Sequence, residues 1–228
     1  MNPETSIQSA YSAQRSTAPP NPRIIPSLDW ISRNHLLSGA LANAPICDQG
    51  CGRLRHLNTL RTYSDHVCLV DQEIQLSRPG DLFTAGRMSV YEYVQLQVRQ
   101  GIDLSVLCAE KFQHSSLAFR LIVNIAVLDV VLPQERVRIL AAASRNLAEG
   151  GLFVLIVPRN DSSILKRCSA SNAYEDGHVF IHHGAATFFA NFRDHSPLVA
   201  GLESCGLAPV ADLSTYRQVC LIALKTKQ

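Results

Sequence analysis

Short apolar runs alternate with amphipathic stretches over the middle of the chain, from residue 44 to residue 158. Short continuous apolar runs have the length of buried strands, whereas apolar residues spaced three or four apart indicate helices packed on one side. Alternation of this kind indicates right-handed β-α-β units and a parallel sheet covered by helices on both faces. The predicted strands are 45–48, 66–71, 103–108, 119–125 and 152–158, and the predicted helices are 53–62, 88–100 and 133–147.

The pattern changes after residue 158. Residues 159–195 contain four of the eight histidines, namely His178, His182, His183 and His195, together with the aromatic run from Phe188 to Phe192. We interpret this stretch as an insert that forms a lid or recognises a substrate. A helix from Pro197 and strands near 208–213 and 217–225 follow, and their short connection predicts an antiparallel hairpin at the C-terminus.

The N-terminal segment differs from the rest of the chain. Its first 23 residues are rich in polar residues and proline and hold few residues able to form a core, so we expect a disordered tail. A periodic apolar stretch that begins near Ser27 predicts a helix before the first strand. A chain of 228 residues is ample for one α/β domain and short for two. We therefore expect a single domain over residues 24–228, with residues 159–195 as its insert.

Composition and charge disfavour several classes of partner. The formal net charge of +2 provides no bulk electrostatic footprint for nucleic acid or for an anionic membrane. No apolar run approaches the roughly 20 residues that span a bilayer, and the polar N-terminus lacks the apolar core of a signal peptide. We expect a cytoplasmic protein. The seven cysteines include no Cys-x-x-Cys pair, which favours buried, reduced thiols over a metal site.

The candidate chemistry lies at the end of the first predicted strand. Residues 46–49 run into the turn Gly50-Cys51-Gly52, and the next strand ends at Asp71. Glycines let the backbone approach a ligand where a Cβ would collide, and an acid about 20 residues later is placed to hold a ribose. The pattern predicts a site for a nucleoside cofactor. It fits a dinucleotide poorly, because Arg55 stands where the G-x-G-x-x-G fingerprint has its third glycine.

The order Asp-x-Gly-x-Gly, with an acid ending the next strand, resembles the class I S-adenosylmethionine-dependent methyltransferases. Residues 119–129 resemble the fourth strand of that family with its active-site end, and residues 147–158 resemble its L-x-x-G-G turn and fifth strand. The resemblance runs in order through residues 26–228. It implies a Rossmann-like three-layer α/β sandwich, whose mostly parallel seven-stranded sheet ends in an antiparallel hairpin. Two positions depart from the family pattern: Leu54 replaces a small residue, and Cys108 replaces an aspartate.

The same resemblance implies S-adenosylmethionine as cofactor and a set of residues around it. Asp71 would accept both ribose hydroxyls, because a carboxylate offers two oxygens to a vicinal diol. Asp48 would meet the cofactor's ammonium through water, or it would only brace the loop. Glu110 would read the adenine, although a solvated turn residue explains it equally well. The predicted set is Asp48, Gly50, Cys51, Gly52, Asp71, Gln72, Ala109, Glu110 and Asn124.

Catalysis of methyl transfer depends mainly on alignment of the reactants and exclusion of water. A general base is needed only where the acceptor carries a proton of high pKa. His178 and His182 are the candidates for that role, and His183 would point elsewhere if residues 179–183 form a strand. A structural role fits each histidine as well.

The acceptor is narrowed by motifs that the chain lacks. The segment Asn124–Val127 stands where amino-methylating DNA enzymes carry an Asn/Asp/Ser-Pro-Pro-aromatic motif, and no cysteine follows a proline as in ring-carbon cytosine enzymes. We therefore favour transfer to O or N of a small molecule. An RNA or protein methyltransferase, with a basic face that includes Arg53, Arg55, Arg159 and Arg167, stays open, and so does a degenerate scaffold protein. A nicotinamide-dependent oxidoreductase is disfavoured by Arg55 and by the hairpin.

Overall fold

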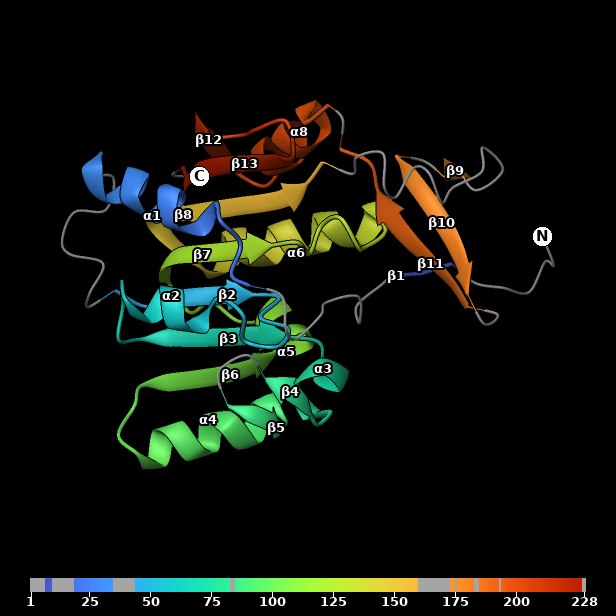
Figure 1. Cartoon of the computed structure of the whole chain (residues 1–228). Coiled ribbons are helices and arrows are strands. Elements are labelled where there is room, and N and C mark those ends of the chain that lie inside the picture. The colour runs from blue at the N-terminus through green and yellow to red at the C-terminus, as the bar shows by residue number, and fades with distance from the viewer. Residues whose placement is uncertain are drawn as a thin grey trace.

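The computed structural model describes residues 7–9, 19–34, 44–82, 85–159, 173–174, 176–182, 185–192 and 194–226. Its centre is a seven-stranded sheet in the order β12-β13-β8-β7-β2-β3-β6 (Figure 1). The strands are β2 (Ile46–Gln49), β3 (Val67–Asp71), β6 (Leu104–Cys108), β7 (Phe119–Ile125), β8 (Leu147–Pro158), β12 (Leu207–Asp212) and β13 (Gln218–Lys225). Only β13 runs against its neighbours, because it pairs antiparallel with both β8 and β12. The predicted mostly parallel sheet and C-terminal hairpin are confirmed.

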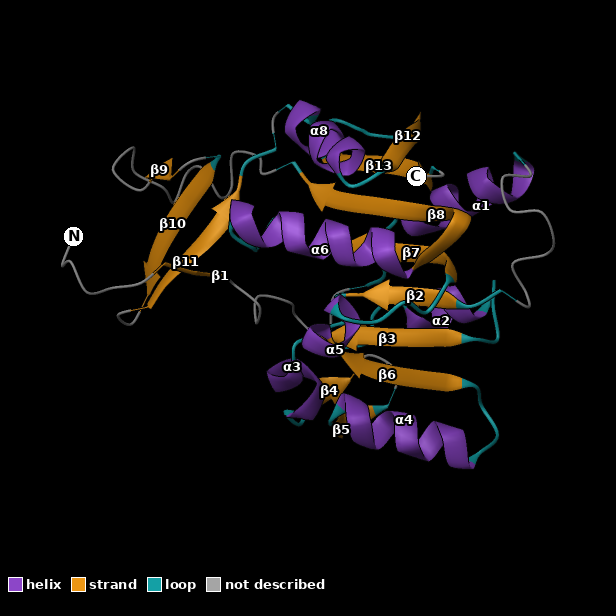
Figure 2. Cartoon of the chain, turned by 180° about the vertical axis from the view of Figure 1, so that it is seen from behind, coloured by secondary structure: helices purple, strands orange, loops and turns teal. Residues whose placement is uncertain are grey.

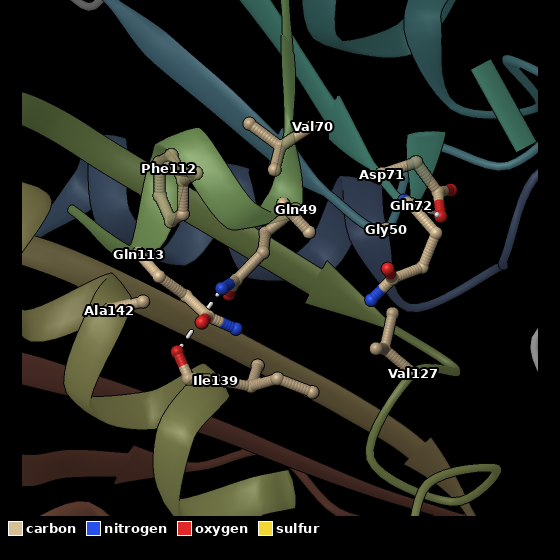
Figure 3. Close-up of a pocket in the computed structure, with 11 residues that line it drawn as sticks. Gln49, Gly50, Val70, Asp71, Gln72, Phe112, Gln113, Val127, Ile139 and Ala142 are labelled. Carbon is tan, nitrogen blue, oxygen red and sulfur yellow. Dashed lines mark hydrogen bonds between the residues drawn. The ribbon is translucent and has the colours of Figure 1, made fainter. Parts of the chain in front are cut away.

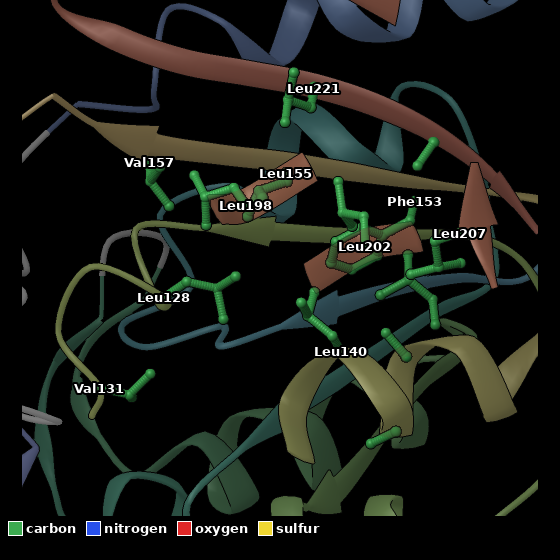
Figure 4. Close-up of a cluster of buried hydrophobic side chains, with 14 of the residues drawn as sticks. Leu128, Val131, Leu140, Phe153, Leu155, Val157, Leu198, Leu202, Leu207 and Leu221 are labelled. Atoms are coloured by element: carbon green, nitrogen blue, oxygen red, sulfur yellow. The ribbon is translucent and has the colours of Figure 1, made fainter. Parts of the chain in front are cut away.

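Helices cover both faces of this sheet (Figure 2). One face carries α1 (Ile24–Arg33), α2 (Leu57–Arg61) and α4 (Val90–Arg99), and the other carries α5 (Ala109–Gln113), α6 (Pro133–Asn146) and α8 (Ser196–Ser204). Successive side chains of a strand point to opposite faces, so each strand contributes to two buried clusters. Within residues 152–157 of β8, Leu152, Val154 and Ile156 belong to one cluster. Phe153, Leu155 and Val157 belong to the other, which is drawn in Figure 4.

Several short elements were not predicted. Between β3 and α4 the chain forms α3 (Glu73–Ser77) and a hairpin of β4 (Gly80–Leu82) and β5 (Gly86–Met88). Helix α2 is shorter than predicted and begins only at Leu57, because residues 52–56 form turns. Helix α1 ends at Arg33, and residues 35–43 lie outside the described part of the chain.

A second, four-stranded sheet lies beside the N-terminal end of α6 (Figure 1). Its order is β1 (Ile7–Ser9), β11 (Ala185–Ala190), β10 (Gly177–His182) and β9 (Ala173–Tyr174). The predicted insert therefore contains three strands, and residues 160–172 lie outside the described residues. Strand β1 falls within the segment predicted to be disordered and pairs in parallel with β11. Strand addition uses backbone N–H and C=O groups, so the polar composition of this segment gave no sign of it.

Arg136 holds the second sheet against the sandwich. Its guanidinium donates to both carboxylate oxygens of Asp176 in the insert, and its Nε donates to Leu128 O at 2.9 Å. The same group lies over the rings of Phe188, at 5.5 Å, and Phe192, at 4.8 Å. A bidentate ion pair and two cation–π contacts at one nearly buried side chain fix the orientation of the insert.

Three properties of the structure concern membrane spans, metal sites and cysteines, which the sequence analysis also considered. Among the described residues, no helix combines the length and apolar character needed to cross a membrane. The described part of the chain also contains no group of three or more His, Cys, Asp or Glu side chains suited to a metal ion. Its six cysteines are free thiols, five of them buried.

Candidate functional site

The glycine turn follows β2 at the carboxyl edge of the sheet, where ligands bind in open α/β folds. Gly50 and Gly52 have φ values of 92° and 51°, in the region that side chains with a Cβ rarely adopt. The N–H groups of Gly50 and Cys51 donate to Val70 O at 2.7 and 3.1 Å, which joins the turn to the end of β3. The turn is thus held by backbone contacts and presents its glycines at this edge.

Asp71 ends β3 and faces the turn. Its Oδ2 accepts the N–H of Gly52 at 2.7 Å, and its Oδ1 accepts the N–H of Gln72 at 2.8 Å. Burial raises the pKa of Asp71, and these two N–H groups oppose the rise. Each carboxylate oxygen has two lone pairs, so each can accept a further hydrogen bond. By this count, each oxygen of Asp71 keeps one further acceptor position beside the two hydrogen bonds seen.

A small cavity opens beside this carboxylate (Figure 3). Its lining combines polar and apolar side chains from β2, β3, α5, α6 and the loop after β7; the residues are Gln49, Gly50, Val70, Asp71, Gln72, Ala109, Phe112, Gln113, Val127, Ile139 and Ala142. Four residues of the predicted cofactor set line it, namely Gly50, Asp71, Gln72 and Ala109. The structure thus brings the turn, the acid and the start of α5 around one space.

The remaining members of the predicted set lie outside this lining. Asp48 is fully buried, and neither carboxylate oxygen has a hydrogen-bond partner among the described residues. Burial and the neighbouring Asp71 raise the pKa of Asp48 to about 7, against the opposing charge of Arg55. Cys51 is fully buried, and burial raises the pKa of its thiol well above the usual value. Glu110 is exposed on α5.

Asn124 does not line the cavity but contacts Gln49, a lining residue that the sequence analysis did not select. Its Nδ2 donates to Gln49 Oε1 at 3.1 Å, and Gln49 Nε2 donates to Ile139 O at 3.1 Å. This chain of hydrogen bonds links β7 to α6 across the cavity, as Figure 3 shows for Gln49 and Ile139. The signal available in the sequence was the amide of Gln49, which directly follows Asp48 at the end of a central strand.

The loop after β7 closes the cavity from the other side. A Cβ built on Gly50 would lie only 2.1 Å from Cγ2 of Val127, so Val127 fills the space that the glycine leaves open. Ala126, just before it, has a φ of 56°, which is strained for a residue with a Cβ. The cavity measures about 50 Å³, whereas sites for drug-sized ligands measure roughly 300–1,000 Å³. Its residues suit a nucleoside, but the present conformation is too closed to hold one.

The two candidate histidines lie on the second sheet. Val179 and Phe188 are paired on its buried face, whereas His178 is paired with Phe189 and projects from the opposite face. His182 lies four residues along the same strand and is paired with Ala185, but its side chain is outside the described part of the structure, and all of His183 lies outside it. His178 is not among the described residues that line the cavity. A catalytic role for His178 or His182 stays a prediction.

Asp129 is a buried acid on the loop after β7, next to the insert. Its backbone oxygen accepts the N–H of Ala190 in β11 at 2.8 Å. Burial raises the pKa of Asp129 to about 7, opposed by its own backbone N–H and by Arg136. Its Oδ1 has no partner among the described residues. The acid lies two residues beyond Val127, between the cavity loop and the second sheet, and the sequence analysis did not identify it.

Comparisons with known proteins identify the fold. No protein-family model matches the sequence, and no curated protein sequence matches it either. Solved structures do match, and three methyltransferases among them are described here. Magnesium protoporphyrin IX methyltransferase from Synechocystis, solved with bound S-adenosylhomocysteine, superposes with a TM-score of 0.59 at 12% identity over 90% of this chain and 82% of that chain. An S-adenosylmethionine-dependent methyltransferase from Methanosarcina mazei gives a TM-score of 0.57 at 18% identity over 86% and 98%.

The third is 1,6-didemethyltoxoflavin-N1-methyltransferase from Burkholderia thailandensis, solved with its substrate and S-adenosylhomocysteine. It gives a TM-score of 0.56 at 17% identity over 97% of this chain and 100% of that chain. These likenesses extend over nearly the whole chain at low identity. The chain therefore has the Rossmann-like fold of the class I methyltransferases.

Proposed function

We propose that this protein is an S-adenosylmethionine-dependent methyltransferase that transfers the methyl group to O or N of a small molecule. The observation that carries the proposal is the contact between Gly52 and Asp71: a glycine turn after the first central strand is held 2.7 Å from an acid at the end of the next strand, beside a cavity. Similar folds solved with S-adenosylhomocysteine support the choice of cofactor.

Different residues of the chain would contact different parts of the cofactor. Asp71 would accept the ribose hydroxyls with its two remaining acceptor sites. Gly50 would allow close approach of the backbone, and Ala109 with Phe112 would border the adenine. S-adenosylmethionine itself supplies an activated methyl carbon, so the protein's task is to align the acceptor and exclude water.

A small acceptor is favoured by the arrangement around the site. Arg53 is buried and its Nη1 donates to Arg78 O at 3.0 Å. Arg159 donates to His195 Nδ1 at 3.3 Å. These two arginines, which the RNA or protein alternative places on an open basic face, are therefore engaged within the protein. The second sheet packs beside the loop that follows β7 and would limit the size of an acceptor there.

The closed cavity supports a specific alternative, a methyltransferase fold that no longer turns over. Cofactor binding requires the Ala126–Val127 loop to move away from Gly50. The apparent affinity for the cofactor is the affinity of the open state multiplied by the fraction of molecules in that state. If the loop never opened, the protein would bind no cofactor and would act only as a scaffold.

The deciding experiment is calorimetric titration of the wild type and of Val127→Ala with S-adenosylhomocysteine, with NAD as the comparison ligand. We expect S-adenosylhomocysteine to bind both proteins, more tightly to the variant, and NAD to bind neither. Absence of S-adenosylhomocysteine binding to both proteins would contradict the proposal and favour the scaffold. Binding of NAD alone would contradict both the methyltransferase proposal and the scaffold alternative.

A further inference from the structure

A second, open groove lies between α5 and α6, next to the cofactor cavity. It measures about 400 Å³ and is lined by Gln113, His114, Arg138, Ala141, Ala142 and Arg145. This volume is within the range of sites for small molecules. Gln113 and Ala142 line both the groove and the cofactor cavity, so the two spaces are adjacent.

The groove has two arginines on its α6 side. Arg138, Ala141, Ala142 and Arg145 have the i, i+3, i+4, i+7 spacing of one helix face, with the two arginines about 10 Å apart along the axis. The small side chains of the two alanines line the bottom of the groove between the arginines. His114, the residue that follows α5, lies on the opposite wall. The described residues that line the groove include no acidic side chain.

The carbonyl groups at the end of α5 would repel an anion if they were open, but they have donors. Arg145 Nη1 donates to Gln113 O, and Asn146 Nδ2 donates to Phe112 O at 2.8 Å. The first contact also fixes the orientation of the Arg145 guanidinium, which has five N–H donors in total. Arg138 is exposed. Guanidinium groups bind phosphate oxygens in a forked geometry that suits such a site.

We propose that this groove binds the phosphate or diphosphate group of a small molecule, with Arg138 and Arg145 as its anion ligands. The assignment goes beyond methyl transfer, because S-adenosylmethionine carries no phosphate and its ribose site lies at Asp71. A polyanion such as RNA would extend beyond a groove of this size and find little bulk positive charge, since the net charge is only +2.

The test is calorimetric titration of the full chain with inorganic pyrophosphate at low ionic strength. We expect one site per chain, a loss of affinity of about tenfold or more in Arg138→Glu, and a smaller loss in Arg138→Lys, which keeps the charge. Arg99→Glu is the matched control, because Arg99 is an exposed arginine of α4. The affinity of Arg99→Glu for pyrophosphate should equal that of the wild type. Thermal unfolding of each variant verifies the fold.

Absence of pyrophosphate binding, or equal affinity in Arg138→Glu, would overturn the proposal. A parallel titration with a single-stranded RNA oligonucleotide separates the sources of phosphate. Binding of the RNA through Arg138 without binding of pyrophosphate would also overturn the small-molecule assignment. Saturation with S-adenosylhomocysteine should leave pyrophosphate affinity unchanged, so failure of the cofactor proposal and failure of this one are distinguishable.

Discussion

The closeness of Val127 to Gly50 allows a double-mutant cycle at the candidate cofactor site. In Gly50→Ala, the new Cβ would meet Val127 Cγ2 at 2.1 Å on a backbone with a φ of 92°. The left-handed conformation costs about 1–2 kcal/mol, and overpacking adds about 1–3 kcal/mol. We expect Gly50→Ala to lower the free energy of unfolding by roughly 2–5 kcal/mol. Adding Val127→Ala should recover the overpacking part, which gives a favourable coupling of about 1–3 kcal/mol.

Urea unfolding provides the measurement, because Trp30 is the only tryptophan and packs against the first buried cluster. The single variants, the double variant and the wild type complete the cycle. Additive effects of the two substitutions would refute the inference that Val127 occupies the space beside Gly50. In the same proteins, Val127→Ala should bind S-adenosylhomocysteine about 5- to 30-fold more tightly, if displacing the valine costs about 1–2 kcal/mol. Equal or weaker binding would show that Val127 does not obstruct the cofactor.

Three further substitutions test the acid at the end of β3, the ion pair that holds the insert and the buried acid after β7. Asp71→Asn should weaken S-adenosylhomocysteine binding by about 1.5–3 kcal/mol in calorimetry, because it loses a charged acceptor; unchanged affinity would remove Asp71 from the site. Arg136→Lys should lower the free energy of urea unfolding by about 2–4 kcal/mol, because one ammonium cannot keep the forked contact with Asp176; an unchanged midpoint would contradict this role. The pKa of Asp129, like that of Asp48, is raised to about 7 in the folded state, so each acid lowers stability as the pH rises from about 4 to 7. Asp129→Asn should remove the Asp129 part of that fall and leave the Asp48 part, with a gain in stability above pH 7 and none near pH 4, as urea unfolding across this range would reveal.

Periodicity predicted the central sheet well because burial on both faces imposes it. The run Leu152–Val157 is apolar throughout, since its odd and even residues enter different clusters. The second sheet was less predictable. Strand β1 depends on backbone pairing with a partner almost 180 residues away, and its side chains give no local signal. The glycine turn and Asp71 were predictable because each has a strict backbone or hydrogen-bonding requirement.

The part of the site that the sequence did not predict arises from packing between distant elements. Gln49 and Val127 enter the cavity because α6 and the loop after β7 close over β2, and Ile139 O accepts the Gln49 amide only in that arrangement. No motif encodes such a contact. Residues at the end of a strand or in the turn that follows can be predicted from local spacing, whereas the lining of a closed cavity depends on the tertiary fold.

The departure at Leu54 changes how the cofactor would be held. The residue is fully buried with a φ of 62°, and its side chain joins the first buried cluster, so the chain continues in turns until α2 begins at Leu57. An ordinary helix start would place several free N–H groups beside the cofactor's carboxylate. Here the helix begins farther from the glycine turn and spans only five residues. Affinity would then depend mainly on the contacts of Asp71 and on how readily the loop that carries Val127 moves away from Gly50. Substitutions at Asp71 and Val127 should therefore change cofactor binding more than any change within α2.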